Sequence, residues 1–513
     1  MIDLPAKGTF HLRAGTRLIA GESSGVVLGE RPFRAFRVNS AAFRILEECR
    51  TGLDAANVFR SDKPEQSSPI LALLDRLCQV GLLEWRPSVG DCEPFVSIVV
   101  PVYNRADDIS ACLESLFALD YPASKREIIV VDDASEDGTA AAVGKWDVKL
   151  IVLKSNQGQS AARNAGVAAA EGEIIACIDS DCIAEPSWLR DLVPYFQDDR
   201  NALVGGYVGS FYRKSLLDRY EEAQSPLNMG EDVLVGSGSE SDMYVPTCNV
   251  LVRRDAYVQV GGLNESLRVG EDVDLCWRLK EQGFRLLYVP RGRVRHKHRN
   301  RFRETFARRF DYGTSEPVLY DAHRDVVKRF PWQHGCMAVL AVCIAGLLAK
   351  QILLLPVACL ILLADSLVKK VRYEKQMKVA LAFGTVLGAT VEKHFHLLHH
   401  LCHHLVRYYL LLMVTLSLLF APLISVTAVL VLFPALVAFF KKRPRLGFPL
   451  FLFFFAAEQA SYQTGVFWGC LRQWTFRPYR LTWFSANGSK RVQASRDGSA
   501  VLANAQGTSI PSR

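Results

Sequence analysis

The 513-residue sequence lacks several patterns that define common protein classes. Its thirteen cysteines include no Cys-x-x-Cys pair and no regular spacing, which excludes a small disulfide scaffold and leaves buried, reduced thiols as the expectation. The N-terminus has no apolar stretch long enough for a signal peptide, so we expect the first 330 residues to stay in the cytosol. The first strand of the large domain runs into PVYNR instead of a Gly-x-Gly-x-x-Gly loop, which disfavours a dehydrogenase.

Charge and hydrophobicity are unevenly distributed along the chain. The mean hydropathy is +0.10 although 22% of the residues are charged, because the long apolar runs are confined to residues 335–471. The segment from Arg291 to Arg309 holds nine Lys or Arg residues and one acid, Glu304, and this difference of +8 equals the net charge of the whole chain. The composition therefore indicates a soluble part followed by a membrane-associated part, and it disfavours a nucleic-acid-binding protein.

Residues 15–86 have the pattern of a small separate module. Short strands are predicted at TRLIA, GVVL and FRAFRV, and Asn39 is placed to cap a helix that runs to about Arg50. After a loop containing Pro64 and Pro69, LALLDRLCQVGLLEW reads as a helix, a break and a final strand. This order fits a winged-helix-like module, and an N-terminal cap on the next domain is the alternative.

Residues 94–290 alternate between predicted strands and helices. SIVVPVY, EIIVVDD, KLIVLKSN and EIIACIDSD read as strands, and ISACLESLFAL and SAARNAGVAAAEG read as helices. Continuous apolar strands are typical of the α/β class, with a parallel sheet covered by helices and ligands bound at the carboxyl ends of the strands. Three strand ends carry polar residues, namely Tyr103-Asn104, Asp132-Asp133 and Asp179-Ser180-Asp181.

The carboxylates of Asp179 and Asp181 follow a buried strand and converge on one point outside the sheet. Without a partner they would repel each other and raise each other's pKa, so a hard divalent cation is the expected ligand. A solvated turn is the alternative for an isolated Asp-x-Asp, but the two other polar strand ends favour a metal site. Since no glycine-rich loop is present, such a site would hold phosphates through the metal.

Six segments, in this order, resemble the family-two glycosyltransferases of the GT-A fold: SIVVPVYN, IIVVDDASEDGT, NQGQSAARNAG, IDSD, TCNVLVRRDAYVQVGGLNE and GEDVDLCWRL. The resemblance covers about residues 95–312. It implies a Rossmann-like nucleotide-sugar domain and an inverting transferase that uses a nucleotide sugar and Mg²⁺ or Mn²⁺.

The resemblance also implies roles for individual residues. Those at the nucleotide would be Pro101, Tyr103, Asp132 and Asp133 at the base and ribose, Arg163 near the base or the diphosphate, and Asp179 near the ribose. Asp181 would ligate the metal, with His296 of VRHKH as a further ligand and His298 as its nearby alternative. Asp272 of GEDVD would be the catalytic base.

Physical chemistry agrees with the roles of the metal and of Asp272. An inverting transfer needs a carboxylate to take the proton of the acceptor hydroxyl and a cation to stabilise the departing diphosphate. Asp272 lies in the first turn of a helix that starts near Gly270, where the helix dipole keeps a carboxylate ionised. Glu271 and Asp274 are alternative bases, and simple capping of the helix by this acidic trio is the alternative to catalysis.

The basic segment 291–309 allows three interpretations. It is a gate over the diphosphate, a contact to anionic lipid headgroups, or a solvated face. We favour lipid contact for most of it, because the apolar third follows directly. The exception is RRFDYG, which resembles a donor-site motif of the family and assigns Arg308 or Arg309 to the donor.

Two apolar blocks, residues 335–368 and 408–440, are each long for one membrane-spanning helix and short for two. Basic residues flank both blocks, so the positive-inside rule favours tight hairpins or re-entrant segments, and helices buried in protein are the alternative. Six histidines in residues 394–404 allow a zinc site, but an interfacial helix with a His-rich polar face is the preferred interpretation.

The N-terminal module narrows the resemblance. GTRLIAGESSGVVLGERPFRAFRVNSAAFRIL is similar to the PqqD-like domains that recognise ribosomal precursor peptides, and its combination with a transferase domain and an apolar tail resembles the mycofactocin-system glycosyltransferases. The resemblance implies transfer of β-1,4-linked glucose from UDP-glucose to the peptide-derived redox cofactor premycofactocin. It also implies a location in the bacterial inner membrane, with the catalytic domain on the cytoplasmic face.

We therefore expect four parts in the chain. They are a PqqD-like winged-helix module at 1–90, a GT-A transferase domain at 91–330, a membrane-associated helical region at 331–480 and a disordered tail at 481–513. Two alternatives remain for the function. One is a membrane transferase acting on lipid-linked or polysaccharide acceptors, and the other is a peptide-binding scaffold with an inactive transferase domain.

Overall fold

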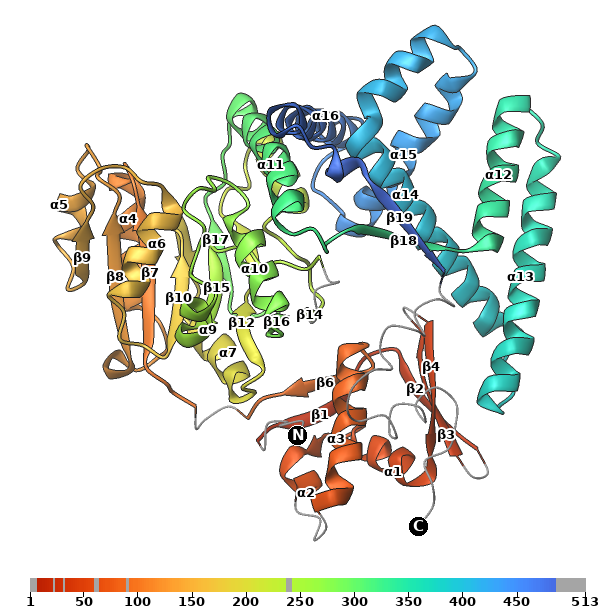
Figure 1. Cartoon of the computed structure of the whole chain (residues 1–513), viewed down its shortest axis with the longest axis horizontal. Helices are drawn as coiled ribbons and strands as arrows, with labels where there is room; N and C mark the ends of the chain where they lie inside the picture. Colours follow the sequence, from red (N-terminus) through yellow and green to blue (C-terminus); the bar gives the residue numbers. More distant parts are fainter. Residues whose placement is uncertain are drawn as a thin grey trace. The chain divides into compact units, whose positions relative to one another are not determined.

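The structure is a computed structural model that describes residues 7–21, 24–30, 33–59, 64–88, 92–236 and 242–485 (Figure 1). It divides into two compact units. One comprises residues 1–88, 328–434 and 481–513, and the other comprises residues 89–327 and 435–480. These units differ from the predicted boundaries, because the α/β domain includes a segment from the apolar third. Most of the predicted tail, residues 486–513, lies outside the described residues.

The N-terminal module contains two antiparallel sheets, in the orders β5–β1–β6 and β2–β3–β4. Its elements are β1 (Thr9–Leu12), β2 (Thr16–Ala20), β3 (Ser24–Glu30), β4 (Phe33–Asn39), α1 (Ser40–Glu48), β5 (Leu53–Asp54), α2 (Ala55–Phe59), α3 (Pro64–Gln79) and β6 (Leu83–Arg86). The predicted cap is confirmed, because Oδ1 of Asn39 accepts a hydrogen bond from the backbone N–H of Ala42 at 2.8 Å. The predicted loop at Pro64 and Pro69 is wrong, since both belong to α3. Pro64 opens the helix, where a proline loses no hydrogen bond.

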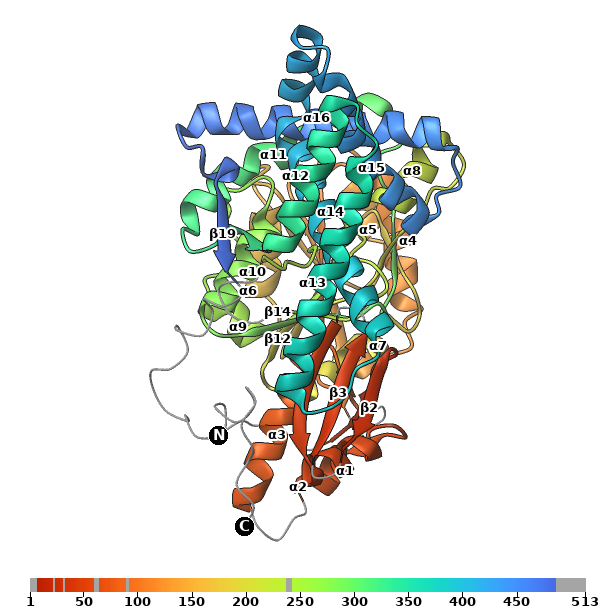
Figure 2. The same ribbon diagram turned by 90° about the vertical axis from the view of Figure 1, so that its right-hand side faces the viewer.

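Four helices form most of the apolar third. They are α12 (His334–Ala349), α13 (Leu354–Met377), α14 (Phe383–Leu419) and α15 (Leu423–Lys442). The first predicted apolar block is broken at Lys350, which has a φ of 54°, and the second is broken between Phe420 and Pro422. α12 and α13 lie side by side as an antiparallel pair (Figures 1 and 2). Among the described helices, α14 and α15 are long and apolar enough to cross a membrane, by length and composition.

The second unit is built on an eight-stranded sheet in the order β14–β16–β12–β15–β10–β7–β8–β9. Its strands are β7 (Val96–Val102), β8 (Arg126–Asp132), β9 (Lys149–Val152), β10 (Ile174–Ile178), β12 (Asn201–Gly205), β14 (Leu234–Gly236), β15 (Asn249–Arg253) and β16 (Arg285–Tyr288). The predicted α/β class is confirmed, but the prediction of an all-parallel sheet is wrong. β15 runs antiparallel to both β10 and β12, and an apolar run shows that a strand is buried without showing its direction.

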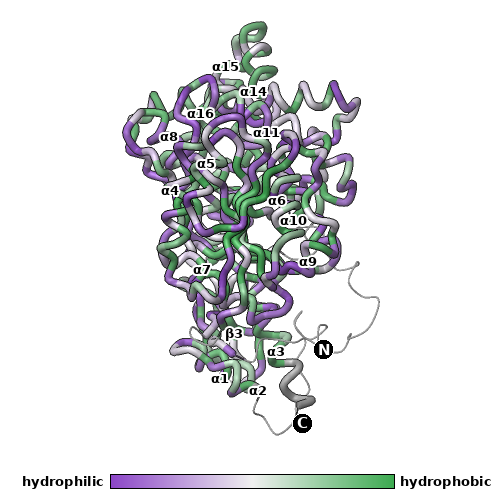
Figure 3. Tube along the Cα trace, turned by 90° about the vertical axis from the view of Figure 1, so that its left-hand side faces the viewer, coloured by the Kyte–Doolittle hydropathy of each residue, from purple (hydrophilic) through white to green (hydrophobic). Residues whose placement is uncertain are grey.

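A smaller sheet and a set of helices complete this unit. The sheet has the order β11–β17–β13, with β11 at Cys182–Ala184, β13 at Val208–Ser210 and β17 at Val294–His296. The helices are α4 (Ala106–Phe117), α5 (Thr139–Val143), α6 (Gln159–Ala168), α7 (Trp188–Leu192), α8 (Leu216–Gln224), α9 (Arg254–Gln259), α10 (Glu271–Glu281), α11 (Phe302–Ala322) and α16 (Phe448–Gln473). Figure 3 shows hydrophobic segments running through the middle of the unit. The core there combines Val99, Ile129, Ile175, Leu203 and Leu286 from five strands.

Helix α16 lies in the region that the sequence assigned to the membrane, but it packs along α11 in the α/β unit (Figure 1). Among the described helices, α14 and α15 have the length and composition of a membrane span, and α16 does not. Eleven of its residues are buried, and these include the polar Glu458, Gln459 and Gln463. Buried polar side chains indicate that this helix face meets protein rather than lipid.

Candidate active site

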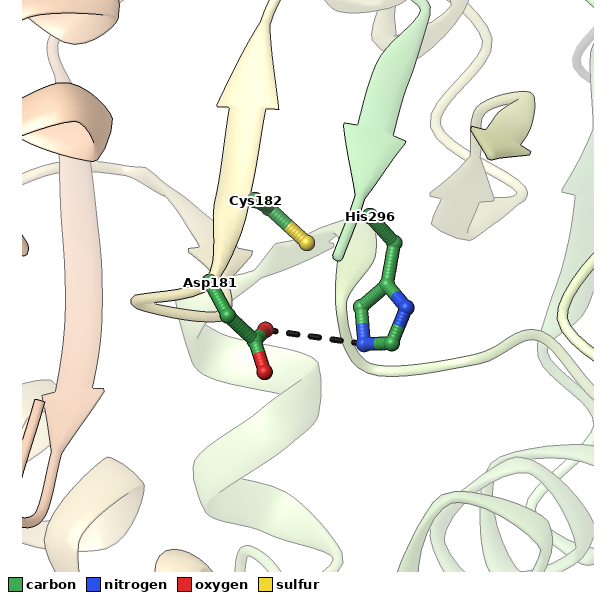
Figure 4. A group of neighbouring side chains, drawn as sticks. All are labelled: Asp181, Cys182 and His296. Atoms are coloured by element: carbon green, nitrogen blue, oxygen red, sulfur yellow. Dashed lines mark ion pairs between the residues drawn. The ribbon is translucent and has the colours of Figure 1, made fainter. Parts of the chain in front are cut away.

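Asp181 and His296 meet where β11 and β17 pair, with Cys182 opposite His296 in the antiparallel register (Figure 4). Oδ1 of Asp181 lies 3.5 Å from Nε2 of His296. That oxygen is buried and accepts no hydrogen bond within the described chain. Burial raises the pKa of Asp181, and His296 acts in the opposite direction. A buried carboxylate oxygen facing an imidazole is a suitable ligand pair for a divalent cation.

The thiol of Cys182 lies in the same group, since one ligand atom of each of the three side chains falls within 4.8 Å of the others. This cysteine is fully buried, and burial raises its pKa well above 9.0. A thiolate is a soft donor, whereas Mg²⁺ and Mn²⁺ prefer oxygen ligands. The oxygen and nitrogen donors therefore define the site, which fits Mn²⁺ or Mg²⁺.

The other histidines considered as metal ligands, His298 and those of residues 394–404, do not belong to the group formed by Asp181, Cys182 and His296. His298 is buried, with Nδ1 at 2.9 Å from Oγ of Ser210 and Nε2 at 3.2 Å from Oδ1 of Asp218. The His-rich segment 394–404 lies within α14. In the described part of the chain, the only group with metal-binding spacing is that of Asp181.

Arg163 links two acidic residues that the sequence treated separately. It projects from α6, is 1% exposed, and donates through Nη2 to Oδ1 of Asp179. Its Nη1 lies 3.8 Å from Oε1 of Glu271, which also accepts a hydrogen bond from Nε2 of Gln159 at 2.7 Å. The buried guanidinium therefore connects the end of β10 to the start of α10. Its predicted contact with the base or the diphosphate stays a prediction, and the sequence offered no signal for Gln159.

The carboxylates that follow β8 shape the loops around the site. Asp132 accepts a hydrogen bond from the N–H of Ser135 at 2.9 Å. Asp133 uses both oxygens, accepting from the N–H groups of Gln157 and Gly158 at 2.7 Å each. Both residues are buried, so in this structure they hold the turns that lead to α5 and α6. Their predicted nucleotide contacts stay predictions.

Pro101 and Tyr103 mark the carboxyl end of β7. Pro101 is a buried strand residue paired with Val131, whereas Tyr103 is 43% exposed. The following Asn104 has a φ of 50° and accepts a hydrogen bond from the N–H of Glu136 at 2.9 Å. Of the two residues proposed to contact the nucleotide here, Tyr103 presents an open surface to a ligand.

The acidic trio opens α10, as predicted, with Gly270 at the cap position in the left-handed conformation. Asp274 is engaged elsewhere, since it binds Arg278 at 2.7 Å and His323 at 2.9 Å. Asp272 is partly buried, and the one hydrogen bond described for its side chain comes from the N–H of Val273 at 2.8 Å. These contacts exclude Asp274 as an available base and leave Asp272, the predicted base, together with its alternative Glu271.

Burial raises the pKa values of the two remaining acids. The pKa of Glu271 is about 7, because of burial first and the neighbouring Asp272 second. The pKa of Asp272 is also raised by burial, while hydrogen bonding and the positive charges of Arg163 and Arg308 act in the opposite direction. A carboxylate with a raised pKa is a stronger base than a solvated one, which suits proton abstraction.

The structure distinguishes between the two arginines of RRFDYG. Arg309 is 5% exposed, and its Nη2 donates to both oxygens of Glu221 at 2.7 and 2.9 Å. Arg308 lies over the ring of Tyr312, 4.9 Å from its centroid, and is close enough to Glu271 and Asp272 to lower their pKa values. Arg308 is therefore the one of the two that faces the site.

Comparison with known proteins identifies the class of this domain. Residues 97–261 match the model of glycosyl transferase family 2. This part of the chain is a family-two glycosyltransferase domain. The glycosyltransferase match contains the strand ends of Asp133, Asp179 and Asp181, and together with the mixed α/β sheet it supports the GT-A fold.

Two curated relatives are themselves transferases. The chain is 32% identical over 314 residues to the pre-mycofactocin glycosyltransferase of Mycobacterium tuberculosis, and this alignment covers 60% of the chain and 62% of that protein. It is 29% identical over 241 residues to the glucosyl-dolichyl phosphate glucuronosyltransferase of Haloferax volcanii, which covers 44% of the chain and 77% of that protein. The alignment with the mycobacterial relative thus spans less than two thirds of its length.

Among solved structures, the chain is similar to the mannosyltransferase PcManGT from Pyrobaculum calidifontis in complex with GDP-Man and Mn²⁺. The identity is 20% and the TM-score is 0.35, with 64% of this chain and 94% of that chain covered. A TM-score of this size does not by itself establish a common fold.

Proposed function

We propose that the protein is an inverting, metal-dependent glycosyltransferase that moves a hexose from a nucleotide sugar to an acceptor hydroxyl. The observation that carries the proposal is the buried Oδ1 of Asp181 facing His296, and the carboxylate of Asp272 at the start of α10 supplies the second group that the reaction needs. A divalent cation held by Asp181 and His296 supplies the positive charge that stabilises a departing diphosphate.

The remaining groups have separate tasks in this reaction. Tyr103 offers an exposed ring for the nucleotide base, and Arg308 adds a positive charge beside the acidic pair. Asp272 takes the proton of the acceptor hydroxyl as that oxygen attacks the anomeric carbon from the side opposite the leaving diphosphate. Arg163 keeps Asp179 and Glu271 in place around this centre.

The acceptor in our proposal is the peptide-derived redox cofactor premycofactocin, with β-1,4-linked glucose supplied by UDP-glucose. Support comes from the 32% identity to the pre-mycofactocin glycosyltransferase and from the N-terminal module, whose sequence resembles the PqqD-like domains. We further propose that α14 and α15 attach the protein to the cytoplasmic face of the inner membrane, and that basic residues around the apolar helices contact lipid headgroups.

A second candidate is a membrane transferase for lipid-linked or polysaccharide acceptors. It is favoured by the apolar helices α14 and α15 and by the similarity to the glucosyl-dolichyl phosphate glucuronosyltransferase. Incubation of the full chain with labelled UDP-glucose, Mn²⁺ and either premycofactocin or a lipid extract distinguishes the two. Label on premycofactocin supports the first proposal, and label extracted only with lipid supports the second. Peptide binding without transfer to either acceptor would favour an inactive scaffold instead.

A further inference from the structure

Helices α11 and α16 approach each other so closely that only glycine fits at their contact. A Cβ atom on Gly465 of α16 would lie 2.0 Å from the carbonyl oxygen of Phe310, and one on Gly469 would lie 2.7 Å from that of Thr314. A Cβ atom on Gly313 of α11 would lie 2.3 Å from the carbonyl oxygen of Tyr462. Glycine at i and i+4 on one face lets two helix backbones touch, so this pair of helices forms one rigid element.

A buried charge network continues the same contact toward the site. Nε of Arg309 in α11 lies 3.3 Å from Oε1 of Glu458 in α16, and the hydroxyl of Tyr220 in α8 donates to Oε2 of Glu458 at 2.5 Å. With the bidentate pair between Arg309 and Glu221, one cation is held by two carboxylates from two different helices. All four residues are at most 9% exposed. Removing one member of such a network leaves a buried charge incompletely paired, which is energetically costly. The arrangement of these four side chains is therefore strongly specified.

Arg309 and Arg308 are neighbours on α11, and they face different partners. Arg309 is fixed by Glu221 of α8 and Glu458 of α16. Arg308 lies nearer the ring of Tyr312, at 4.9 Å from its centroid against 5.9 Å for Arg309, and its charge acts on Glu271 and Asp272. Consecutive helix residues differ by about 100° in direction, so fixing the rotation of α11 at Arg309 also fixes where Arg308 points. The far end of α11 is held by His323, which binds Asp274 at 2.9 Å.

We propose that Glu458 is a positioning residue for the donor: by holding Arg309 it sets the rotation of α11 and places Arg308 where it meets the diphosphate of the nucleotide sugar. This inference rests on the proposed transferase function. It gives α16 a role in the active site, although the helix follows the whole transferase domain and the apolar helices in the sequence. Donor affinity thus depends on the C-terminal part of the chain.

The test compares two variants that each remove one carboxylate from the contact between α11 and α16. Glu458→Gln retains the shape of the side chain and removes the charge that faces Arg309. Glu316→Gln is the matched control, because Glu316 accepts a hydrogen bond from the hydroxyl of Tyr462 across the same contact, about two helical turns along α11 from Arg309. The dissociation constants of uridine diphosphate and of uridine are measured by calorimetry on the full chain with Mn²⁺. The same two constants are measured for guanosine diphosphate and guanosine, and the diphosphate that the wild type binds more tightly is the preferred one.

We expect Glu458→Gln to bind the preferred diphosphate about tenfold more weakly, with the affinity for the nucleoside unchanged and with Glu316→Gln like the wild type. Unchanged diphosphate binding in Glu458→Gln would overturn the inference, and so would an equal loss for nucleoside and diphosphate, which indicates general loosening. If Glu458→Gln does not fold, Arg309→Lys, which lacks the Nε that faces Glu458, is tested for the same selective loss. A wild type that binds neither diphosphate would instead contradict the proposed function.

Discussion

The carboxylate of Asp181 and the imidazole of His296 face each other at 3.5 Å across the pairing of β11 with β17. Neither position alone is informative, because Asp-x-Asp and a surface histidine are both common. Their juxtaposition leaves a buried oxygen of Asp181 without a hydrogen bond in the described residues, and in our proposal a divalent cation would be its partner.

Replacing either member of this pair is expected to remove metal binding. Asp181→Ala and His296→Ala each take away a ligand, so Mn²⁺ affinity, measured by calorimetry in the presence of uridine diphosphate, should fall by more than about a hundredfold. The matched control is His298→Ala, whose ring is bound by Ser210 and Asp218. It should lower the melting temperature and leave Mn²⁺ affinity intact. Loss of the metal in His298→Ala alone would reverse the assignment.

Measurements of kcat should distinguish Asp272, the predicted base, from the neighbouring Asp274. Asp272→Asn is expected to reduce kcat by about 10²–10⁴-fold, because the amide cannot take the proton of the acceptor hydroxyl, while donor affinity changes little. Asp274→Asn loses its ion pairs with Arg278 and His323, so it should lower the melting temperature more than it lowers kcat. A transfer rate in Asp272→Asn equal to that of the wild type would show that the assignment is wrong.

Glu271 makes the stability of the free protein depend on pH. Its pKa is 4.5 when unperturbed and about 7 in the folded protein, because of burial and of Asp272. Between these pH values Glu271 is protonated in the folded state and ionised in the unfolded state. The free energy of unfolding therefore decreases as the pH rises from 4.5 to about 7, and Glu271 causes no further change above that pH.

Melting temperatures measured across this range test the assignment. Glu271→Gln cannot ionise, so its melting temperature should decline less than that of the wild type as the pH rises through the window. Glu136→Gln, at an exposed position, is the control and should follow the wild type. Parallel curves for the wild type and Glu271→Gln would contradict the raised pKa.

The contact between α11 and α16 should tolerate no side chain. Gly465→Val would place its Cβ 2.0 Å from the carbonyl oxygen of Phe310, and such overpacking is expected to cost about 3 kcal/mol of stability. Gly447→Val, at the start of α16, meets no atom within 4 Å and should be close to neutral. Chemical denaturation of both variants makes the comparison, and equal midpoints would show that the two helices are not tightly packed.

The parts of the site that follow buried strands were predictable, because burial and the ends of strands are local properties of the sequence. The strands ending near Asp132 and Asp179 and the helix opened by Glu271 form where their patterns indicate. The family resemblance favoured His296 over His298, but the residue pattern alone could not choose between them. The two residues are separated by a single position, and which one faces Asp181 depends on how β17 pairs with β11.

The amino-acid sequence by itself determined the α/β class, the acidic strand ends and the presence of a family-two transferase domain, because these depend on patterns within short segments. Tertiary structure alone decided the antiparallel direction of β15, the separate partners of Arg308 and Arg309, and the place of α16 against α11. The apolar composition of α16 suits lipid and protein equally. The position of α16 against α11 depends on glycines that allow backbone contact and on the buried carboxylate of Glu458. The cationic partner of Glu458 is Arg309, which lies far away in the sequence.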